Sequence, residues 1–189
     1  YMSIKYASIY GDELDGVIFL GTGNQPKAVV DSGLKLAHIA KLVRGERYRS
    51  ELLNTIMFGA YNKRIKDNRT ANDWLTKDTK IVDEYLSDPK CSYKFTANAY
   101  IGFLNVIKYD IDKKNIAKTP DKLPVLFASG LEDPVGDYGK GVKKAFKMYT
   151  KYVDNVELYL YEDDRHELHS ETDREDIFSD LYEWIEENV

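Results

Sequence analysis

The sequence predicts an α/β protein with about three parallel strands, flanking helices and a long helical cap insertion. Three short runs rich in apolar residues stand between turn signals, at residues 16–23, 124–130 and 156–161. Helical patterns follow the second and third runs, so that strand and helix alternate in units of roughly 30 residues, as in right-handed crossovers between parallel strands. The 189 residues suffice for one large domain, or for a domain with an insertion.

Charge and composition exclude several classes of protein. The chain has 27 basic and 32 acidic residues, a net charge of -5, so it lacks the basic footprint of a nucleic-acid-binding protein. No apolar run approaches the roughly 20 residues that span a bilayer, and a cytoplasmic protein is expected. The single cysteine, Cys91, excludes a disulfide within the chain. We therefore expect no nucleic-acid partner and no transmembrane segment.

The first elements are a helix and a strand. Residues 1–10 place apolar side chains roughly along one helical face, and Gly11 stands where a helix C-cap belongs. The helix has no N-cap residue before Tyr1, so we expect the sequence to begin inside an element of a longer protein. The continuous apolar run at 16–23 predicts a strand that is buried on both faces of the sheet.

A different region lies between the first two strands, at about 27–118. It holds three helical patterns and is far longer than an ordinary connection of about 2–6 residues, so it predicts a helical cap over one end of the sheet. The expected division is core at 1–26, cap at 27–118 and core at 119–189. The aromatic residues of the cap are interpreted mainly as core, and some also as substrate contacts. The three patterns are Leu34, Ala37, Ala40 and Val43; Ile81, Val82, Tyr85 and Leu86; and Phe95, Ala99, Phe103 and Val106.

The last two strands are each followed by a helix. The run at 124–130 is continuously apolar, whereas the run at 156–161 alternates, which places it nearer the edge of the sheet. Apolar residues recur at helical spacing across 142–153 and again across 177–185. Thr172 and Glu175 form a possible capping box ahead of the last helix.

Polar residues that can cooperate follow these two strands. Asp133 stands a few residues after the second strand, and His166 follows the third. Ligands of open parallel sheets bind beyond the carboxyl ends of the strands. The 33 residues from Asp133 to His166 fit one helix and one strand, which predicts neighbouring loops. A carboxylate behind an imidazole orients it and stabilises its charged form, so we predict a catalytic pair with oxygen and nitrogen about 2.6–3.2 Å apart.

The pair needs a nucleophile that the sequence does not supply. No serine stands in G-x-S-x-G, the strained turn that exposes a nucleophile above such a sheet. Ser129 lacks the first glycine of that turn, and Cys91 falls in the expected cap, so neither is favoured. We expect the nucleophile to be missing from this sequence. Glu132 and Asp137 stay open as alternative partners of the histidine.

Simpler interpretations compete with the catalytic one. His166 could be a surface histidine in an acidic loop, and His169 is interpreted as one. Asp163 joins these two histidines as a possible metal ligand set, but their spacing matches no established zinc motif. The glycines of 21–23 resemble a dinucleotide loop, but Pro26 stands where G-x-G-x-x-G requires glycine. No metal and no cofactor are therefore expected.

Several stretches resemble one known family. "SGLEDPVGDYGKGV" and "YEDDRHELHSETDRE" resemble the acid and histidine segments of α/β-hydrolases of the lysophospholipase and monoacylglycerol lipase type. "WLTKDTKIVDEYLSDPKCSYKFTANAY" resembles the cap of that family, and "YMSIKYASIYGDELDGVIFLGTG" is similar to the segment that follows its nucleophile elbow. The resemblance implies the carboxyl-terminal half of such a hydrolase, with Asp133 as triad acid and His166 as triad base. The serine and the oxyanion hole would lie upstream.

The resemblance also implies an activity. It points to a serine hydrolase that cleaves carboxylic esters of lysophospholipid or monoacylglycerol type, with these 189 residues inactive alone. Peptidases use the same scaffold, and a non-catalytic interaction module is the alternative from another class. The first strand would expose an unpaired edge, which predicts self-association or association with the missing amino-terminal half.

Overall fold

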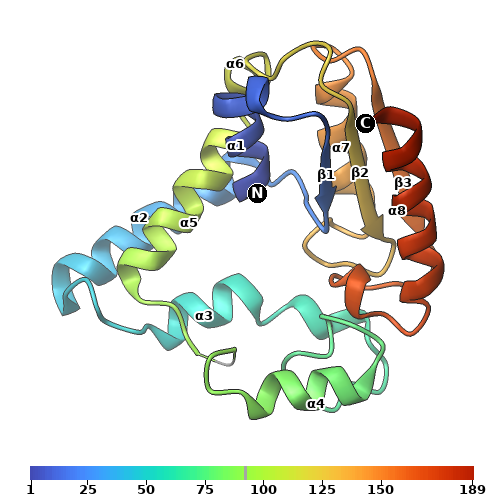
Figure 1. The fold of residues 1–189 in the computed structure, drawn as a ribbon. Coiled ribbons are helices and arrows are strands. Elements are labelled where there is room, and N and C mark those ends of the chain that lie inside the picture. Colours follow the sequence, from blue (N-terminus) through green and yellow to red (C-terminus); the bar gives the residue numbers. More distant parts are fainter. Residues whose placement is uncertain (92) are drawn as a thin grey trace.

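The computed structural model describes residues 1–91 and 93–189 and contains a three-stranded parallel sheet (Figure 1). Its strands are β1 (Val17–Leu20), β2 (Val125–Gly130) and β3 (Val156–Tyr161), in the order β1-β2-β3. Val125 is the register partner of Val17 on one side and of Val156 on the other. The predicted α/β class with parallel strands is confirmed.

The three strands differ in burial because of their places in the sheet. All six residues of the central strand β2 are buried, and all six of the edge strand β3 are half-buried, as its alternating sequence predicted. The expectation that β1 is covered on both faces was wrong. Phe19 is buried, but Leu20 is 42% exposed. In the described part of the chain β1 pairs with β2 alone, so it forms the other edge.

Helices cover both faces of the sheet. Helices α1 (Met2–Tyr10) and α7 (Lys140–Tyr149) pack on one face, where their apolar residues form a core with Phe19 and Phe127. Helix α8 (Arg174–Asn188) covers the other face through Ile177. Because side chains alternate along a strand, β2 contributes to both cores.

Helix α8 begins differently from the prediction. The capping box of Thr172 and Glu175 is wrong, because Asp173 occupies the N-cap position and makes no capping bond with its side chain. The Asp173 carboxylate instead lies 3.4 Å from the ammonium group of Lys77. A contact across the fold therefore replaces the local cap.

The region between β1 and β2 is helical, as predicted. The side chains of Ser50, Asp78, Thr96 and Asp112 each accept a backbone N–H at the start of a helix, the usual role of an N-cap. Residue 92 of the predicted cap lies outside the described residues, and the division of the chain into core and cap stays a prediction. None of the described helices is both long and apolar enough to cross a membrane. The helices are α2 (Lys27–Arg44), α3 (Glu51–Phe58), α4 (Thr79–Ser87), α5 (Ala97–Asp110) and α6 (Lys113–Ile116).

The buried face of α5 agrees with the predicted one only in part, because Val106 is buried and Phe103 packs half-buried against the core of the helical region. Thr96 caps the helix, so Phe95 lies before its first turn, and Ala99 is exposed. Tyr100, Leu104 and Ile107 are buried as well, and the last two pack against α2.

Asp110, the last residue of α5, gives the fold a pH dependence. It is 5% exposed, and neither carboxylate oxygen has a hydrogen-bond partner among residues 1–91 and 93–189. Burial raises the pKa of Asp110 to about 7, well above the ordinary value of about 3.9 for aspartate. The folded state therefore holds a proton that the unfolded state releases, and this group lowers stability as pH rises from about 4 to about 7.

We expect Asp110→Asn to be more stable than the wild-type protein at pH 8, with a smaller difference at pH 5. Urea unfolding of both proteins at the two pH values measures this, and the comparison cancels the contributions of other carboxylates. A stability difference that does not change between pH 5 and pH 8 would contradict the buried, protonated carboxyl.

Candidate active site

Asp133 and His166 lie in contact at the carboxyl end of the sheet. Nδ1 of His166 is 3.1 Å from Oδ2 of Asp133, within the predicted range. The second carboxylate oxygen accepts the backbone N–H of Val135 at 2.8 Å. Asp133 is fully buried, whereas the His166 side chain is 26% exposed. The carboxylate is therefore fixed from both sides, while the imidazole borders the solvent.

Strand register brings the two loops together. Gly130 at the end of β2 is the register partner of Tyr161 at the end of β3, so both loops leave the sheet side by side. The pairing continues beyond the strands, where the Glu132 N–H donates to the Asp164 carbonyl at 2.8 Å. A Cβ at Gly130 would stand 2.1 Å from that same carbonyl oxygen, so glycine alone permits this approach.

Gly21, after the end of β1, approaches the histidine from the other side. Its φ is +58°, a left-handed conformation that favours glycine. A Cβ there would stand 2.7 Å from the His166 carbonyl oxygen and 2.9 Å from Nδ1. Gly21 thus makes a bend at the end of β1, beside the imidazole.

The face of the imidazole is covered by aromatic residues. The ring of Trp74 lies 5.2 Å from that of His166, and Tyr61 packs edge-on against Trp74 at 4.8 Å. Phe58 stacks on the far side of Trp74 at 6.3 Å. Burial and the nearby charge of Asp133 raise the pKa of Tyr61 to about 12, so its hydroxyl stays neutral. These side chains form an apolar wall next to the histidine.

Among the described residues, Asp133 is the hydrogen-bond partner of the His166 ring, and it binds Nδ1. No serine or cysteine of residues 1–91 and 93–189 donates to Nε2. An imidazole held at Nδ1 by a carboxylate, with Nε2 available, has the arrangement of a general base.

The backbone of the histidine loop is bound to the segment before α4. His166 N–H donates to the carbonyl of Trp74 at 3.4 Å, and Glu167 N–H donates to that of Leu75 at 2.7 Å. We call the paired segments 73–78 and 164–171 the histidine clamp. It joins residues about 90 positions apart, which the sequence analysis did not predict.

Glu171 is the central polar residue of the histidine clamp. Its buried carboxylate accepts the Arg165 N–H at 2.7 Å, the Lys77 N–H at 2.9 Å and the Thr76 hydroxyl at 2.9 Å. Burial raises the pKa of Glu171, although these three donors act in the opposite direction. One side chain thereby connects the residue before His166 to the helical region.

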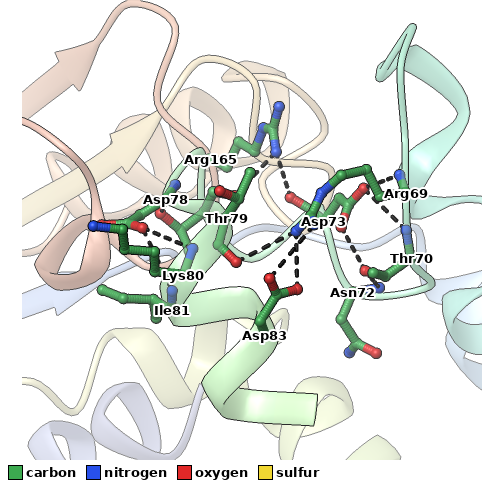
Figure 2. Close-up of polar contacts among 11 residues, drawn as sticks. Arg69, Thr70, Asn72, Asp73, Asp78, Thr79, Lys80, Ile81, Asp83 and Arg165 are labelled. Atoms are coloured by element: carbon green, nitrogen blue, oxygen red, sulfur yellow. Dashed lines mark hydrogen bonds and ion pairs between the residues drawn. The ribbon is translucent and has the colours of Figure 1, made fainter. Parts of the chain in front are cut away.

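Arg165 makes a second connection, shown in Figure 2. Its guanidinium donates to the carbonyls of Asp73 at 2.7 Å and Thr76 at 3.0 Å. The Asp73 carboxylate in turn accepts the backbone N–H groups of Arg69 and Thr70 and folds 69–73 into a tight turn (Figure 2). The segment that receives Arg165 is thus itself fixed.

The other candidates lie apart from the imidazole. Ser129 is buried, and its hydroxyl donates to the carbonyl of Gly130 at 3.3 Å. Cys91 follows α4, and burial raises the pKa of its thiol. Glu132 and Asp137 are exposed, and no contact between either carboxylate and the imidazole appears in the described part of the chain. The geometry therefore favours Asp133 over both alternatives as the partner of the histidine.

Carboxylates gather at a different place from the metal set considered in the sequence. Asp164, Glu171 and Asp173 have oxygens within 4.8 Å of one another, whereas Asp163 and His169 do not belong to the group. The Lys77 ammonium lies 2.5 Å from Asp164 and 3.4 Å from Asp173. The cation at this cluster is therefore a side chain of the histidine clamp.

Comparison with known proteins assigns the chain to a family. The sequence profile of the Hydrolase_4 family, described as serine aminopeptidase S33, matches residues 1–173. None of the curated proteins compared with the chain matches it significantly.

Several solved structures share the fold. A thermostable carboxyl esterase from Bacillus coagulans superposes with a TM-score of 0.90 at 23% identity, covering 99% of this chain and 61% of its own. A lipase in an open form superposes with a TM-score of 0.82 at 26% identity, and the match covers 98% of this chain and 61% of the lipase. A soluble variant of monoglyceride lipase from Saccharomyces cerevisiae superposes with a TM-score of 0.67 at 19% identity, and the match covers 100% of this chain and 58% of the lipase. The chain thus spans about 61% of the length of the first two structures.

The match over residues 1–173 extends across most of the 189 residues, and the parallel sheet agrees with the solved structures. The chain belongs to the Hydrolase_4 (serine aminopeptidase, S33) family of α/β-hydrolases.

Proposed function

We propose that this chain supplies the acid and the base of a serine ester hydrolase. Asp133 is the triad acid, His166 is the triad base, and the nucleophilic serine comes from a segment outside residues 1–189. The observation that carries the proposal is the 3.1 Å contact at Nδ1, which leaves Nε2 available. Nε2 would take the serine proton during attack on the ester carbonyl and return it to the leaving alcohol, while Asp133 stabilises the imidazolium.

The aromatic wall supports an ester with an apolar acyl chain. Phe58, Tyr61 and Trp74 present apolar surface beside the imidazole, and the neutral Tyr61 hydroxyl adds one polar group. The solved structures of similar fold include a carboxyl esterase and a monoglyceride lipase. We infer a monoacylglycerol or lysophospholipid type of substrate.

A peptidase is the second candidate, because the matching family is described as serine aminopeptidase. The same three groups would then cleave an amide. Parallel assays with a p-nitrophenyl ester and an aminoacyl p-nitroanilide distinguish the two. Ester turnover supports the first proposal, and turnover of the anilide alone supports the second.

We expect residues 1–189 not to react with a fluorophosphonate probe and not to hydrolyse p-nitrophenyl butyrate. The protein that includes the upstream segment should do both, with the label on a serine of that segment. The reason is that the upstream segment is proposed to supply both the nucleophile and the oxyanion hole. Loss of a single oxyanion donor already lowers the rate by about 10²–10³-fold. Mass spectrometry of the labelled peptide checks the site. Stoichiometric labelling of a serine within residues 1–189 would contradict the assignment.

The open edge of the sheet supports the proposal of an upstream segment or a second copy. Beside β1, a shallow groove of about 400 Å³ is lined by Met2, Tyr6, Leu14 and Val17, among others. Met2 is 70% exposed and Tyr6 is 46% exposed. An unpaired strand next to exposed apolar residues is a template for another strand. Association through this edge stays a prediction, as does a cytoplasmic location.

A further inference from the structure

One face of α7 carries only lysines. They recur at i, i+3, i+4, i+7 and i+11, which places them in one stripe along the helix. All five are exposed, while the opposite face packs into the core through Val142, Ala145 and Tyr149. We call these residues the lysine stripe: Lys140, Lys143, Lys144, Lys147 and Lys151, the last of which stands just beyond the end of the helix.

The lysine stripe lines an open groove of about 740 Å³. Lys113 of α6 forms part of the same groove, together with Met148 and Thr150. In the part of the chain that the structure describes, none of these six lysines lies within ion-pair distance of a carboxylate. Lys27, by contrast, pairs with Asp31. The stripe therefore has no counterion within its own fold.

This arrangement has a cost that the described contacts do not offset. Like charges three and four residues apart on a helix repel each other and destabilise it. The positive charge is also concentrated, because residues 113–151 contain nine lysines and four carboxylates in a chain whose net charge is -5. An external ligand with several negative charges would compensate both effects.

The groove is accessible and is not lined by residues of the open edge of the sheet. Helix α7 packs on one face of the sheet and reaches Phe19 of β1 through Tyr149, while its lysines stand on the side of the helix opposite to this core. A segment that pairs with β1 would extend the sheet at its edge and not cover that side of the helix. Such a segment would therefore leave the lysine stripe exposed. The lining of the groove includes neither Asp133 nor His166, so binding at the lysine stripe and ester turnover can be assayed separately.

We propose that the lysine stripe binds the surface of a bilayer that contains anionic phospholipids. Lysine ammonium groups on flexible stems act as point charges for phosphate groups, and the stems with Met148 give the groove apolar walls. The lining contains no arginine and no aromatic side chain, the two residue types that clamp phosphates in two places and stack on bases. These features favour a bilayer over a nucleic acid.

Co-sedimentation with vesicles tests the proposal. We expect the protein to bind vesicles of phosphatidylcholine with about 30 mol% phosphatidylglycerol, and not vesicles of phosphatidylcholine alone. Binding should fall steeply with added salt, because the exposed charges are screened. Each lysine near such a surface contributes a factor of about five. The triple variant Lys143→Ala, Lys144→Ala, Lys147→Ala should therefore bind about 100-fold more weakly.

A matched control separates the lysine stripe from net charge. The triple variant Lys63→Ala, Lys66→Ala, Lys80→Ala removes the same charge from exposed lysines that do not line the groove. It should keep binding within a factor of about five of the wild-type protein, because distant charges are screened. Circular dichroism melts show whether both variants stay folded, as expected for exposed positions.

Three results would overturn the proposal. The first is equal binding to neutral and anionic vesicles, or binding to neither. The second is an equal loss in both triple variants, which would leave only a general charge effect. The third is tighter binding of single-stranded RNA than of anionic vesicles, with loss in the stripe variant, which would assign the groove to a nucleic acid.

Discussion

Replacing His166 with alanine is expected to lower turnover of a p-nitrophenyl ester by about 10⁴-fold or more in the protein that carries the nucleophile. The imidazole is the group in contact with Asp133, and its Nε2 is available to move a proton. Without it the serine stays protonated, and the leaving alcohol receives no proton. Stopped-flow or steady-state kcat measures the loss, and the melting temperature shows that the half-exposed site tolerates the change.

His169→Ala is the matched control, because this exposed histidine stands three residues further along and contacts no proposed site residue. It should retain near wild-type kcat. Asp133→Asn preserves size but no longer fixes the imidazole tautomer, and we expect a loss of about 10⁴-fold from it too. The assignment fails if the His166→Ala protein keeps more than about a tenth of wild-type turnover, since general-base catalysis is typically worth 10²–10⁴-fold.

Replacing Glu171 with alanine is expected to destabilise the fold by about 3 kcal/mol. The carboxylate accepts three donors in a buried place, and each donor left unpaired costs about 1–3 kcal/mol. The variant no longer buries a carboxylate, and the desolvation free energy that is saved offsets part of this loss of stability. The free energy of unfolding in urea measures the effect, and in the active protein kcat should fall because the Arg165 backbone no longer fixes the loop of His166.

Two variants separate the role of Glu171 from its charge. Glu171→Gln keeps a carbonyl acceptor of similar shape and should recover part of both stability and kcat. Glu175→Ala removes an exposed carboxylate from the first turn of α8 and should change stability by less than about 0.5 kcal/mol. Unchanged stability of the Glu171→Ala protein would show that the histidine clamp is held by its backbone bonds alone.

The sheet and the proposed pair could be predicted because their signals are local. Apolar runs between turn residues marked β2 and β3, and parallel topology requires that loops after neighbouring strands share an edge. The contact between Asp133 and His166 follows from those two facts. The structure adds the distance and the burial, while the catalytic role awaits the variants above.

Features that depend on distant contacts could not be predicted. The unpaired edge of β1 was expected from the family resemblance, but the apolar run itself indicated a covered strand and gave no sign that Leu20 would be 42% exposed. Glu171 stands in "HSETDRE" among other polar residues, and nothing local distinguishes it from Glu175, which is exposed. Its partners Thr76 and Lys77 lie about 95 residues earlier, so no spacing rule connects them.

The histidine clamp also limits how the helical region can move. Because Trp74 and Leu75 are hydrogen-bonded to the backbone of the histidine loop, segment 73–78 must travel with the sheet during any breathing motion. Gly45, with a φ of +86°, joins α2 and α3, but the carbonyls of Glu46 and Tyr48 beside it accept the N–H groups of Asn98 and Ala97, so this turn is itself held to α5. A movement of segment 73–78 would also move the loop that holds the imidazole, so the helical region and the position of the proposed base are mechanically linked.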